Sequence, residues 1–199
     1  MKETTENYRR GQHNGQQFVD MGLPSGLLWA TCNVGASSPE QAGLYFAWGE
    51  TNGHEKDSGY EFSRANYNAG PAGHISAGLT LEQDAAHAYL GDGWRMPTKT
   101  EFEELTNGCN SMCVANYKNT GVNGRLLTSK NNGNTLFFPA AGVCVGNSLY
   151  YWGSYGYVWA ATFIGGPFAC NLEFEWGFYS TGSRGIRYYG QTVRAVREP

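Results

Sequence analysis

The chain has 199 residues, a formal net charge of −3 and 16% charged residues. This length is typical of one domain and is sufficient to bury a substantial core. Lys and Arg are scattered and form no basic patch, so we expect no nucleic-acid partner. No apolar run approaches the roughly 18 residues of a membrane span. Residues 1–7 lead into no apolar segment, so we expect neither membrane insertion nor a secretory signal.

The composition also indicates the fold class. Twenty-eight glycines and 15% aromatic residues favour short strands and many turns over a bundle of long helices. Residues 1–17 are polar and aperiodic, so we expect a flexible tail there and a folded domain over 18–199. The five cysteines cannot all pair, and we expect them to be reduced or incidental. Cys109 and Cys113 alone are a weak metal-binding motif.

The N-terminal part of the domain predicts a hairpin and a buried strand. Residues 18–23 and 27–32 have strand composition, and the Pro-Ser-Gly sequence between them is typical of a turn. A Ser-Pro pair that begins at Ser38, with Gln41 three residues after the cap, predicts a short helix. The apolar run 44–48 is expected to be a buried strand.

A long polar insertion follows over residues 49–78, and loops of this length are either functional or mobile. His54 and His74 lie in it together with acidic residues, and a metal site is one interpretation. Solvated loop residues are far commoner, so we expect no metal and no cofactor. Thr80 then begins a capping-box pattern for a helix that ends at Gly91. We expect its inner face to consist of Leu81, Ala85, Ala88 and Tyr89.

The sequence Gly-Asp-Gly-Trp-Arg-Met-Pro-Thr over residues 91–98 is the most distinctive short motif. Trp94 is expected to be a buried anchor, because its ring is costly to leave in water. Arg95 is interpreted as a brace that hydrogen-bonds loop carbonyls and not as a catalytic residue.

The middle of the chain predicts one more helix and a hairpin. Thr98 and Glu101 form a capping box for a helix that Gly108 closes, with an inner face of Phe102 and Leu105. Strands are expected at residues 126–128 and 135–139, joined through a turn at Asn132-Gly133.

Residues 151–196 have a composition typical of a recognition surface. Between Gly153 and Tyr189 there is no Lys, Gln, Met, Asp or His, while Tyr, Ser, Gly, Thr and Phe are abundant. Tyr provides contact area at low entropic cost, and Ser and Gly adapt to a partner. The alternative interpretation is that these residues are aromatic core strands. Residues 177–186 follow no period-two alternation, so we expect a loop that carries exposed aromatic side chains.

Strings along the chain resemble one protein family. They are residues 19–36 (V-D-M-G-L-P-S-G-L-L-W-A-T-C-N-V-G-A), 45–51 (Y-F-A-W-G-E-T), 84–86 (D-A-A), 94–98 (W-R-M-P-T), 138–142 (F-P-A-A-G), Tyr151-Trp152 and Val193-Arg194. From Phe18 to Glu198 the chain resembles the major paralogous domain of Fibrobacter and Bacteroides proteins. That family is similar to the C-type lectin fold in its formylglycine-generating-enzyme branch. The resemblance implies an α+β, C-type lectin-like fold with short helices packed on small antiparallel sheets and with long loops.

Many members of this family are surface or secreted proteins, which implies a phage virion or a bacterial cell surface as the location. Some resemble the variable proteins of diversity-generating retroelements, in which adenine-directed mutagenesis rewrites a C-terminal segment. Randomising the first two bases of an Asn codon never gives Lys, Gln, Glu, Met or Trp. Residues 153–189 contain almost only the allowed residues, and Asn171 is the only Asn after Asn147.

Some positions in the segment are expected to be fixed scaffold. Four residues cannot arise from such codons: Trp159, Glu173, Glu175 and Trp176. Leu172 and Phe174 alternate with Glu173 and predict a core strand, and residues 187–197 are expected to be the closing strand.

The resemblance therefore implies a ligand-binding protein without catalysis or cofactor, whose segment 151–196 varies to change its target. The partner is expected to be a protein or glycan receptor on a cell surface, and the oligomeric state is left open. The candidate contact residues are Tyr155, Tyr157, Phe163, Ile164, Phe168, Phe178, Tyr179, Ser180, Ser183, Arg184, Ile186, Tyr188 and Tyr189.

Other classes fit the sequence less well or differently. The alternative is an invariant cell-surface adhesin or a calcium-independent glycan-binding module of the same fold. A calcium-dependent sugar lectin needs a Glu-Pro-Asn or Gln-Pro-Asp string, and the chain has neither. An oxidase like the formylglycine-generating enzyme needs a redox-competent cysteine pair, and Cys144 and Cys170 lie in no such motif.

Overall fold

The computed structural model describes residues 10–69 and 78–199 and consists mainly of antiparallel strands with few short helices, in agreement with the α+β class. The central sheet has five strands in the order β1-β2-β3-β13-β4. In that order the strands are Arg10–His13, Gln16–Asp20, Leu28–Asn33, Arg194–Arg197 and Trp94–Arg95. Strands from the beginning and the end of the domain therefore meet in one sheet.

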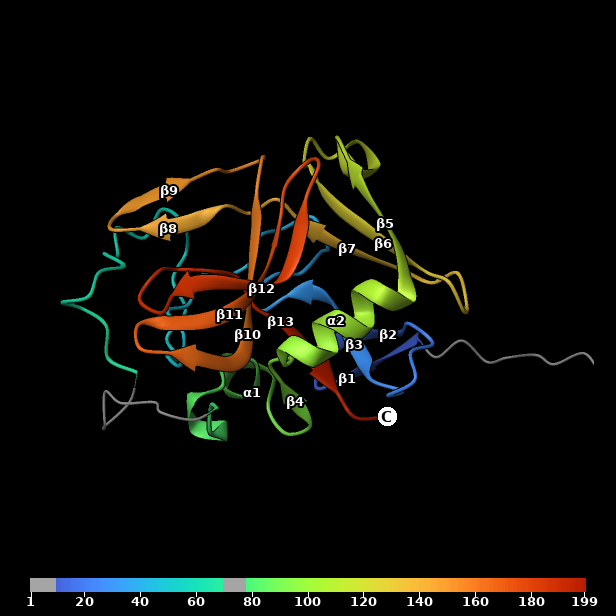
Figure 1. Cartoon of the computed structure of the whole chain (residues 1–199), viewed down its shortest axis with the longest axis horizontal. Helices are drawn as coiled ribbons and strands as arrows, with labels where there is room; N and C mark the ends of the chain where they lie inside the picture. Colours follow the sequence, from blue (N-terminus) through green and yellow to red (C-terminus); the bar gives the residue numbers. More distant parts are fainter. Residues whose placement is uncertain (1–9, 70–77) are drawn as a thin grey trace, which may run out of the picture.

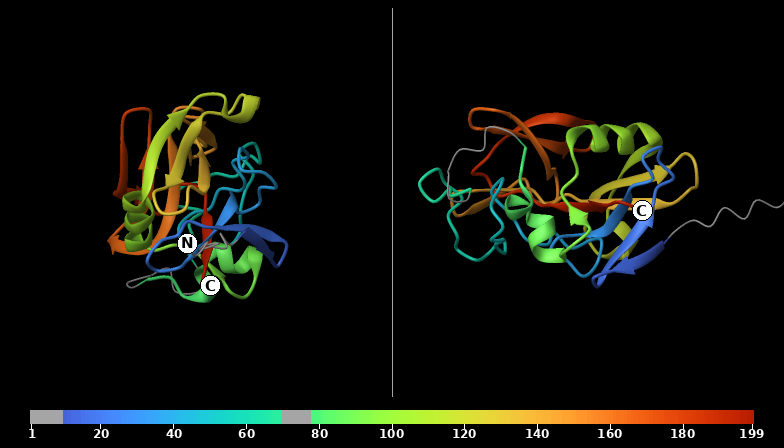
Figure 2. Two further views of the ribbon diagram at one scale, coloured as in Figure 1. Left: turned by 90° about the vertical axis from the view of Figure 1, so that its right-hand side faces the viewer. Right: turned by 90° about the horizontal axis from the view of Figure 1, so that it is seen from below.

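Three smaller sheets surround the central one. They are β5-β6-β7 (Cys109–Val114, Gly124–Ser129, Thr135–Pro139), the hairpin β8-β9 (Val143–Val145, Ser148–Tyr150) and β10-β11-β12 (Gly156–Gly165, Phe168–Phe174, Tyr179–Ile186). Figure 1 shows the β8-β9 hairpin at the upper left, next to the β10-β11-β12 sheet, and β5-β6-β7 at the upper right. In Figure 2, helix α2 (Lys99–Gly108) lies on the same side as the β10-β11-β12 sheet, opposite the blue strands of the central sheet.

Helix α2 begins as the sequence predicts. The Glu101 N–H donates to the Thr98 hydroxyl oxygen at 3.3 Å, and the Thr98 N–H donates to the Glu101 carboxylate at 2.7 Å. The predicted inner residues Phe102 and Leu105 are both buried. This reciprocal cap satisfies two N–H groups that a helix start leaves without partners.

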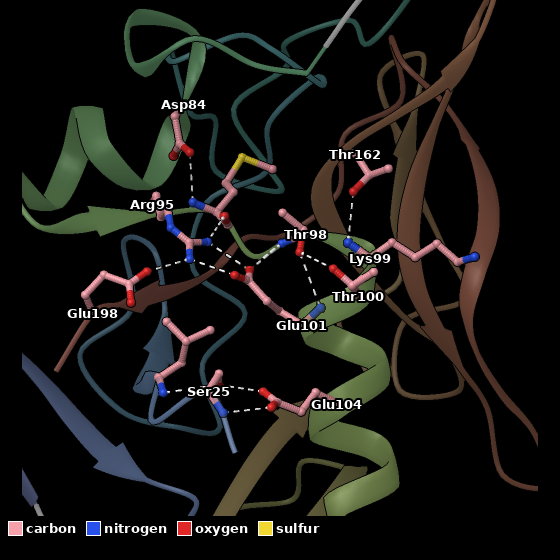
Figure 3. A network of polar contacts seen from close by, with 12 residues as sticks. Ser25, Asp84, Arg95, Thr98, Lys99, Thr100, Glu101, Glu104, Thr162 and Glu198 are labelled. Atoms are coloured by element: carbon pink, nitrogen blue, oxygen red, sulfur yellow. Dashed lines mark hydrogen bonds and ion pairs between the residues drawn. The ribbon is translucent and has the colours of Figure 1, made fainter. Parts of the chain in front are cut away.

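Arg95 has a different main role from the expected one (Figure 3). Its guanidinium forms a bidentate ion pair with Glu101 at 2.7 and 2.8 Å and a second ion pair with Glu198 at 3.0 Å. It also donates to one backbone carbonyl, that of Met96, at 3.3 Å. Arg95 therefore ties β4 to the start of α2 mainly through carboxylates and only secondarily through a loop carbonyl.

The second predicted helix is interrupted. Leu81–Gln83 is a 3-10 turn (η1), and α1 starts anew over Ala85–Leu90 with Asp84 as its N-cap. The predicted inner face is wrong because this break rotates the following residues. Ala85 is buried as expected and Ala86 is buried beside it, whereas the other three predicted residues are exposed: Leu81, Ala88 and Tyr89.

The N-terminal part also departs from expectation. Strand β1 pairs with β2 along residues that were expected to belong to the tail, so the sheet begins before Phe18, and residues 1–9 lie outside the described part. Residues 38–41 form a turn and no helix, and the Gln41 carboxamide accepts the N–H of Ser37 at 2.8 Å. In the run 44–48, which is mostly buried as expected, only isolated bridges form.

The hairpin expected in the middle of the chain is confirmed. β6 and β7 contain the predicted strands and pair antiparallel, with Gly133 in the turn at a φ of 72°. The sequence did not predict β5 or the short 3-10 turn η2 (Tyr117–Asn119).

Buried tryptophans connect the predicted run 44–48 to β10. The Trp48 indole donates to the Ala160 carbonyl at 2.7 Å, and the Trp159 indole donates to the Phe46 carbonyl at 2.8 Å. Trp94 is 1% exposed, which confirms the predicted anchor. Such indole N–H bonds allow large rings to be buried without an unsatisfied donor.

Arg194 on β13 is fully buried and holds the C-terminal strand in place. Its guanidinium donates to the carbonyls of Ala30, Thr31 and Phe137 and to Asn33 Oδ1, at 3.0 to 3.2 Å. A buried guanidinium is tolerated where its donors are satisfied in this way. β13 is thereby fixed to β3 and β7.

The polar insertion is partly packed in the described residues. Phe62 is 3% exposed and pairs with Gly146, between β8 and β9, while His54 stacks on Tyr60 with ring centroids 3.6 Å apart. His74 lies outside the described residues. Within the described ranges, no group of three or more His, Cys, Asp or Glu side chains could hold a metal ion. None of the helices over those ranges has the length and hydrophobicity of a bilayer-spanning helix.

Candidate functional site

The two faces of the β10-β11-β12 sheet carry different residues. One face belongs to the main core cluster and contributes Val158, Ala160, Cys170, Leu172 and Phe174. The predicted core strand around Leu172 and Phe174 is therefore confirmed. Because side chains alternate along a strand, the residues between them point to the second face. Cross-strand neighbours on this second face are Tyr157 with Glu173 and Trp159 with Asn171.

A groove of about 500 Å³ lies between this second face and the β8-β9 hairpin. The hairpin side contributes Val143, Val145, Tyr150 and Tyr151. The β11-β12 side contributes Phe168, Arg184, Gly185 and Ile186. Asn171 and Gln191, each 2% exposed, form its floor together with the half-buried Tyr157 and Glu173, and Tyr189 completes the lining.

Two glycines shape this groove. Gly142 precedes β8 with a φ of 65°, and a Cβ atom there would lie 2.2 Å from the Tyr150 carbonyl oxygen. Gly185 lies over the floor, where a Cβ atom would be 2.3 Å from the Trp159 ring and 2.6 Å from Gln191 Nε2. A side chain at either position would push the hairpin or β12 away from the floor.

The floor contains a buried amide pair. Asn171 Nδ2 donates to Gln191 Oε1 at 2.9 Å. Asn171 Oδ1 is buried and has no hydrogen-bond partner within the described part of the chain. The indole nitrogen of Trp29 on β3 is another buried polar atom without a partner in the described part of the chain.

Tyrosines and glutamates adjoin one another beside the groove. The Tyr155 and Tyr157 rings stack with centroids 5.9 Å apart and 7° between their planes, and Tyr151 lies 5.1 Å from Tyr155. Burial and the nearby Glu173 carboxylate raise the pKa of Tyr157. Hydrogen bonding to Glu175 raises the pKa of Tyr155. Both hydroxyls therefore remain protonated donors at neutral pH.

Each of the thirteen predicted contact residues is at least partly exposed. Five of them line the groove: Tyr157, Phe168, Arg184, Ile186 and Tyr189. A second hollow of about 520 Å³, which Tyr67 and Arg187 line, is bordered by Ile186 and by a further predicted residue, Tyr188. Ser180 and Ser183 on β12 lie opposite Glu173 and Asn171 on β11.

The remaining predicted residues lie at the ends of these strands. Phe178 and Tyr179, 47% and 42% exposed, follow the turn between β11 and β12, and Ile164, 37% exposed, lies near the opposite end. Tyr179 is covered on one side by the Arg125 guanidinium, 4.9 Å from the ring centroid. Phe163 instead stacks on Trp48 with centroids 5.9 Å apart and packs on the second core cluster.

The expected loop over residues 177–186 is mostly a strand. Tyr179–Ile186 is β12, which pairs with β11. A register shift between Asn171 and Glu173 disturbs the pairing, and this explains why the sequence shows no clean alternation there. The exposed aromatic side chains expected in this stretch are present at Phe178 and Tyr179.

Sequence reasoning missed several exposed or groove-lining residues. Tyr150, Tyr151 and Trp152 are 48%, 57% and 47% exposed, and Trp176, expected to be a scaffold position, is 69% exposed and has no core packing. The only sequence pattern that could have indicated exposed tryptophans at turns is the Trp-Gly pair, which occurs at residues 152–153 and 176–177. The same pair at Trp48 is buried, so the signal does not discriminate.

Burial affects the ionisation of three of the five cysteines. All five are free. Burial raises the pKa of Cys109 and Cys170 to about 11 and that of Cys144 to about 12. Thiols of this kind remain protonated at neutral pH and are weak nucleophiles.

A comparison with known proteins adds no relative to this description. No family model, no curated protein and no solved structure matches the chain.

Proposed function

We propose that this chain is a ligand-binding protein with a C-type lectin-like fold, in which residues 151–196 supply the contact surface. A diversity-generating retroelement rewrites exposed positions in this segment and thereby changes the target. The partner is a protein or glycan receptor on a cell surface, the chain acts on a phage virion or a bacterial surface, and no catalysis takes place.

The observation that carries the proposal is the separation of replaceable from fixed positions on β10, β11 and β12. All thirteen candidate contact residues are at least partly exposed, whereas Trp159, Leu172 and Phe174 between them are buried. Substitutions on a surface usually change stability by less than about 0.5 kcal/mol. Truncations in a core cost about 2–5 kcal/mol. Exposed side chains of this segment can therefore be replaced, and the target thereby changed, while the domain stays folded.

The framework around the segment supports the same proposal. Small antiparallel sheets and two short α-helices pack against each other, as the family resemblance implies. Near the end of the segment, the buried Arg194 fixes β13 to β3 and β7. The segment thus contains at least one buried position that ties its last strand to the rest of the domain.

The protonated thiols support a function without catalysis. An oxidase that resembles the formylglycine-generating enzyme needs reactive thiolates. Cys144 and Cys170 are buried, and their raised pKa values oppose thiolate formation.

The gene's own DNA provides the test. We expect a near-repeat of the coding segment for residues 151–196 close to the gene, with a reverse-transcriptase gene alongside. In the repeat, AAC or AAT should stand at codons for contact residues such as Tyr157 and Tyr179. Codons for Trp159, Leu172 and Phe174 should be identical in both copies and serve as the internal control. If no repeat exists, the segment does not vary, and the second candidate, an invariant adhesin of the same fold, replaces the proposal.

A further inference from the structure

The second face of the β10-β11-β12 sheet carries two carboxylates at one end. Glu173 lies opposite Tyr157 on β10 and Ser180 on β12. Glu175 follows two residues later, and its N–H still bonds the Phe178 carbonyl at 2.9 Å, so the strand alternation points both carboxylates to the same face. Both are half-buried, and neither belongs to an ion pair within residues 10–69 and 78–199. Partial burial takes water away from a carboxylate, and a cation supplied by a partner offsets that loss.

The basic side chains around this end of the sheet are directed elsewhere. Arg184 borders the groove, but the strand register places it opposite Cys170, whose side chain belongs to the core cluster on the other face. Arg125 also lies on that other face, where its guanidinium is 6.0 Å from the centroid of the Phe174 ring. Lys56 pairs with a neighbouring aspartate at 2.5 Å. Within the described ranges, the two carboxylates therefore give the second face a negative charge.

Three tyrosines surround these carboxylates. The Tyr155 ring lies 5.1 Å from the Tyr151 ring and stacks on the Tyr157 ring at 5.9 Å. Glu175 is within hydrogen-bonding reach of Tyr155, and Glu173 is within reach of Tyr157. The face of an aromatic ring is electron-rich and attracts a cation, so rings and carboxylates favour the same kind of ligand. We call these five residues the tyrosine–glutamate cluster.

An arginine side chain matches the cluster in shape and in charge. The guanidinium group is planar, stacks on aromatic faces and donates two parallel hydrogen bonds to a carboxylate. A lysine ammonium group is compact and strongly hydrated, and it offers no flat surface to a ring. Anionic groups are repelled by the two carboxylates. The adjoining groove of about 500 Å³, which Tyr151, Tyr157 and Glu173 line, leaves room for a side chain that projects from a partner.

The carboxylates differ from the tyrosines in how they respond to codon randomisation. A randomised Asn codon gives Tyr but never Glu. If the segment is rewritten as proposed, Glu173 and Glu175 stay constant while the rings around them change. All versions of the protein would then keep the same negative anchor, and the variable side chains would select among partners that present a cation.

We propose that the tyrosine–glutamate cluster binds an arginine side chain of a protein receptor. The inference rests on the binding role proposed for residues 151–196 and narrows the partner to a protein with an exposed arginine.

An NMR titration of the full chain, labelled with nitrogen-15, tests the inference. The probes are N-acetyl-arginine amide and N-acetyl-citrulline amide, which have nearly the same shape but differ in charge. We expect the arginine probe to shift the backbone amide signals of residues 155–157 and 173–175. The citrulline probe should bind at least about fivefold more weakly, at the upper end of the effect of a partly exposed ion pair.

Variants of the cluster show which side chains hold the probe. Glu173→Gln and Glu175→Gln should each weaken binding of the arginine probe about fivefold. Tyr151→Leu should weaken it about threefold, as expected for loss of a cation–π contact at an exposed site. The matched control is Asp92→Asn, which removes one exposed negative charge in the turn between α1 and β4 and should leave the affinity unchanged. Thermal unfolding shows whether each variant is folded, and the two glutamate variants decide the question if Tyr151→Leu is not.

Three results would overturn the inference. The arginine probe shifts no signal of the cluster, or the citrulline probe binds as tightly, or Asp92→Asn weakens binding as much as Glu173→Gln does. The last result would mean that the probe responds only to the net charge of the protein. A DNA near-repeat combined with no arginine binding would leave the proposed function in place and remove only the arginine anchor.

Discussion

Two phenylalanines on either side of the β11-β12 turn test the separation of fixed and replaceable positions. Phe174 is 1% exposed in the main core, and Phe178 is 47% exposed. Truncating a buried Phe to Ala costs about 3–5 kcal/mol. Complete burial of such a side chain is worth about 1.5–3 kcal/mol. Because Phe178 is buried over only about half of its surface, Phe178→Ala should cost about half of this, roughly 0.8–1.5 kcal/mol.

Thermal unfolding measures this difference. For a domain of this size, 1 kcal/mol shifts Tm by roughly 2–4 °C. Phe174→Ala should therefore lower Tm by about 6–20 °C, and Phe178→Ala should lower it less, by about 2–6 °C. Urea titrations should give lower midpoints with an unchanged m value, which shows that the folded state itself lost stability. Equal losses for the two variants would refute the division into core and surface positions.

Three further substitutions test the framework. Glu101→Gln removes the carboxylate that pairs with Arg95. Burial alone raises the pKa of Glu101, but hydrogen bonds from Arg95 and from the helix cap outweigh the burial. The pKa of Glu101 in the folded state therefore lies below its usual value. The ionised Glu101 contributes its full share to the free energy of unfolding above about pH 4.3, and this share is lost as the pH falls further. In urea titrations from pH 7 to 3, the free energy of unfolding of the variant should therefore fall less than that of the unmodified protein. Asp84→Asn should cost about 1–3 kcal/mol, because the carboxylate accepts three backbone N–H groups and an amide offers only one oxygen; a melting curve like that of the unmodified protein would contradict this cap. Gly142→Ala should lower the free energy of unfolding clearly more than Gly153→Ala. Both glycines have a positive φ, and the left-handed conformation alone costs a residue with a side chain about 1–2 kcal/mol. Only at Gly142 would the added Cβ atom also lie 2.2 Å from a carbonyl oxygen.

Local signals predicted the elements whose structure is decided locally. Thr98 and Glu101 lie three residues apart and bond each other, so their pattern alone fixes the start of α2. Thr80 has the same pattern, but Asp84 a few residues later caps a helix of its own. A second capping residue within one turn gave two possible starts, and the Met96 N–H that also bonds Asp84 comes from a distant part of the chain.

The candidate site depends on contacts that no local pattern encodes. The groove exists because the β8-β9 hairpin stands beside β11 and β12, and this brings Val143 and Val145 next to residues far along the chain. The aromatic contact residues proposed from the sequence are partly exposed, whereas Trp159 and Phe174 of the same segment are buried. It could not show that Phe163 packs on Trp48 or that Asn171 ends beneath a groove.

The position of β13 inside the central sheet makes folding of the domain sensitive to frameshifts in the preceding segment. β13 pairs with β3 on one side and with β4 on the other. A ribosome makes it only after the whole of residues 151–193, so any insertion or deletion that shifts the reading frame there deletes both the strand and Arg194. Such products would leave two unpaired strand edges and are expected to be degraded. Completion of the central sheet therefore depends on translation in frame through residue 197.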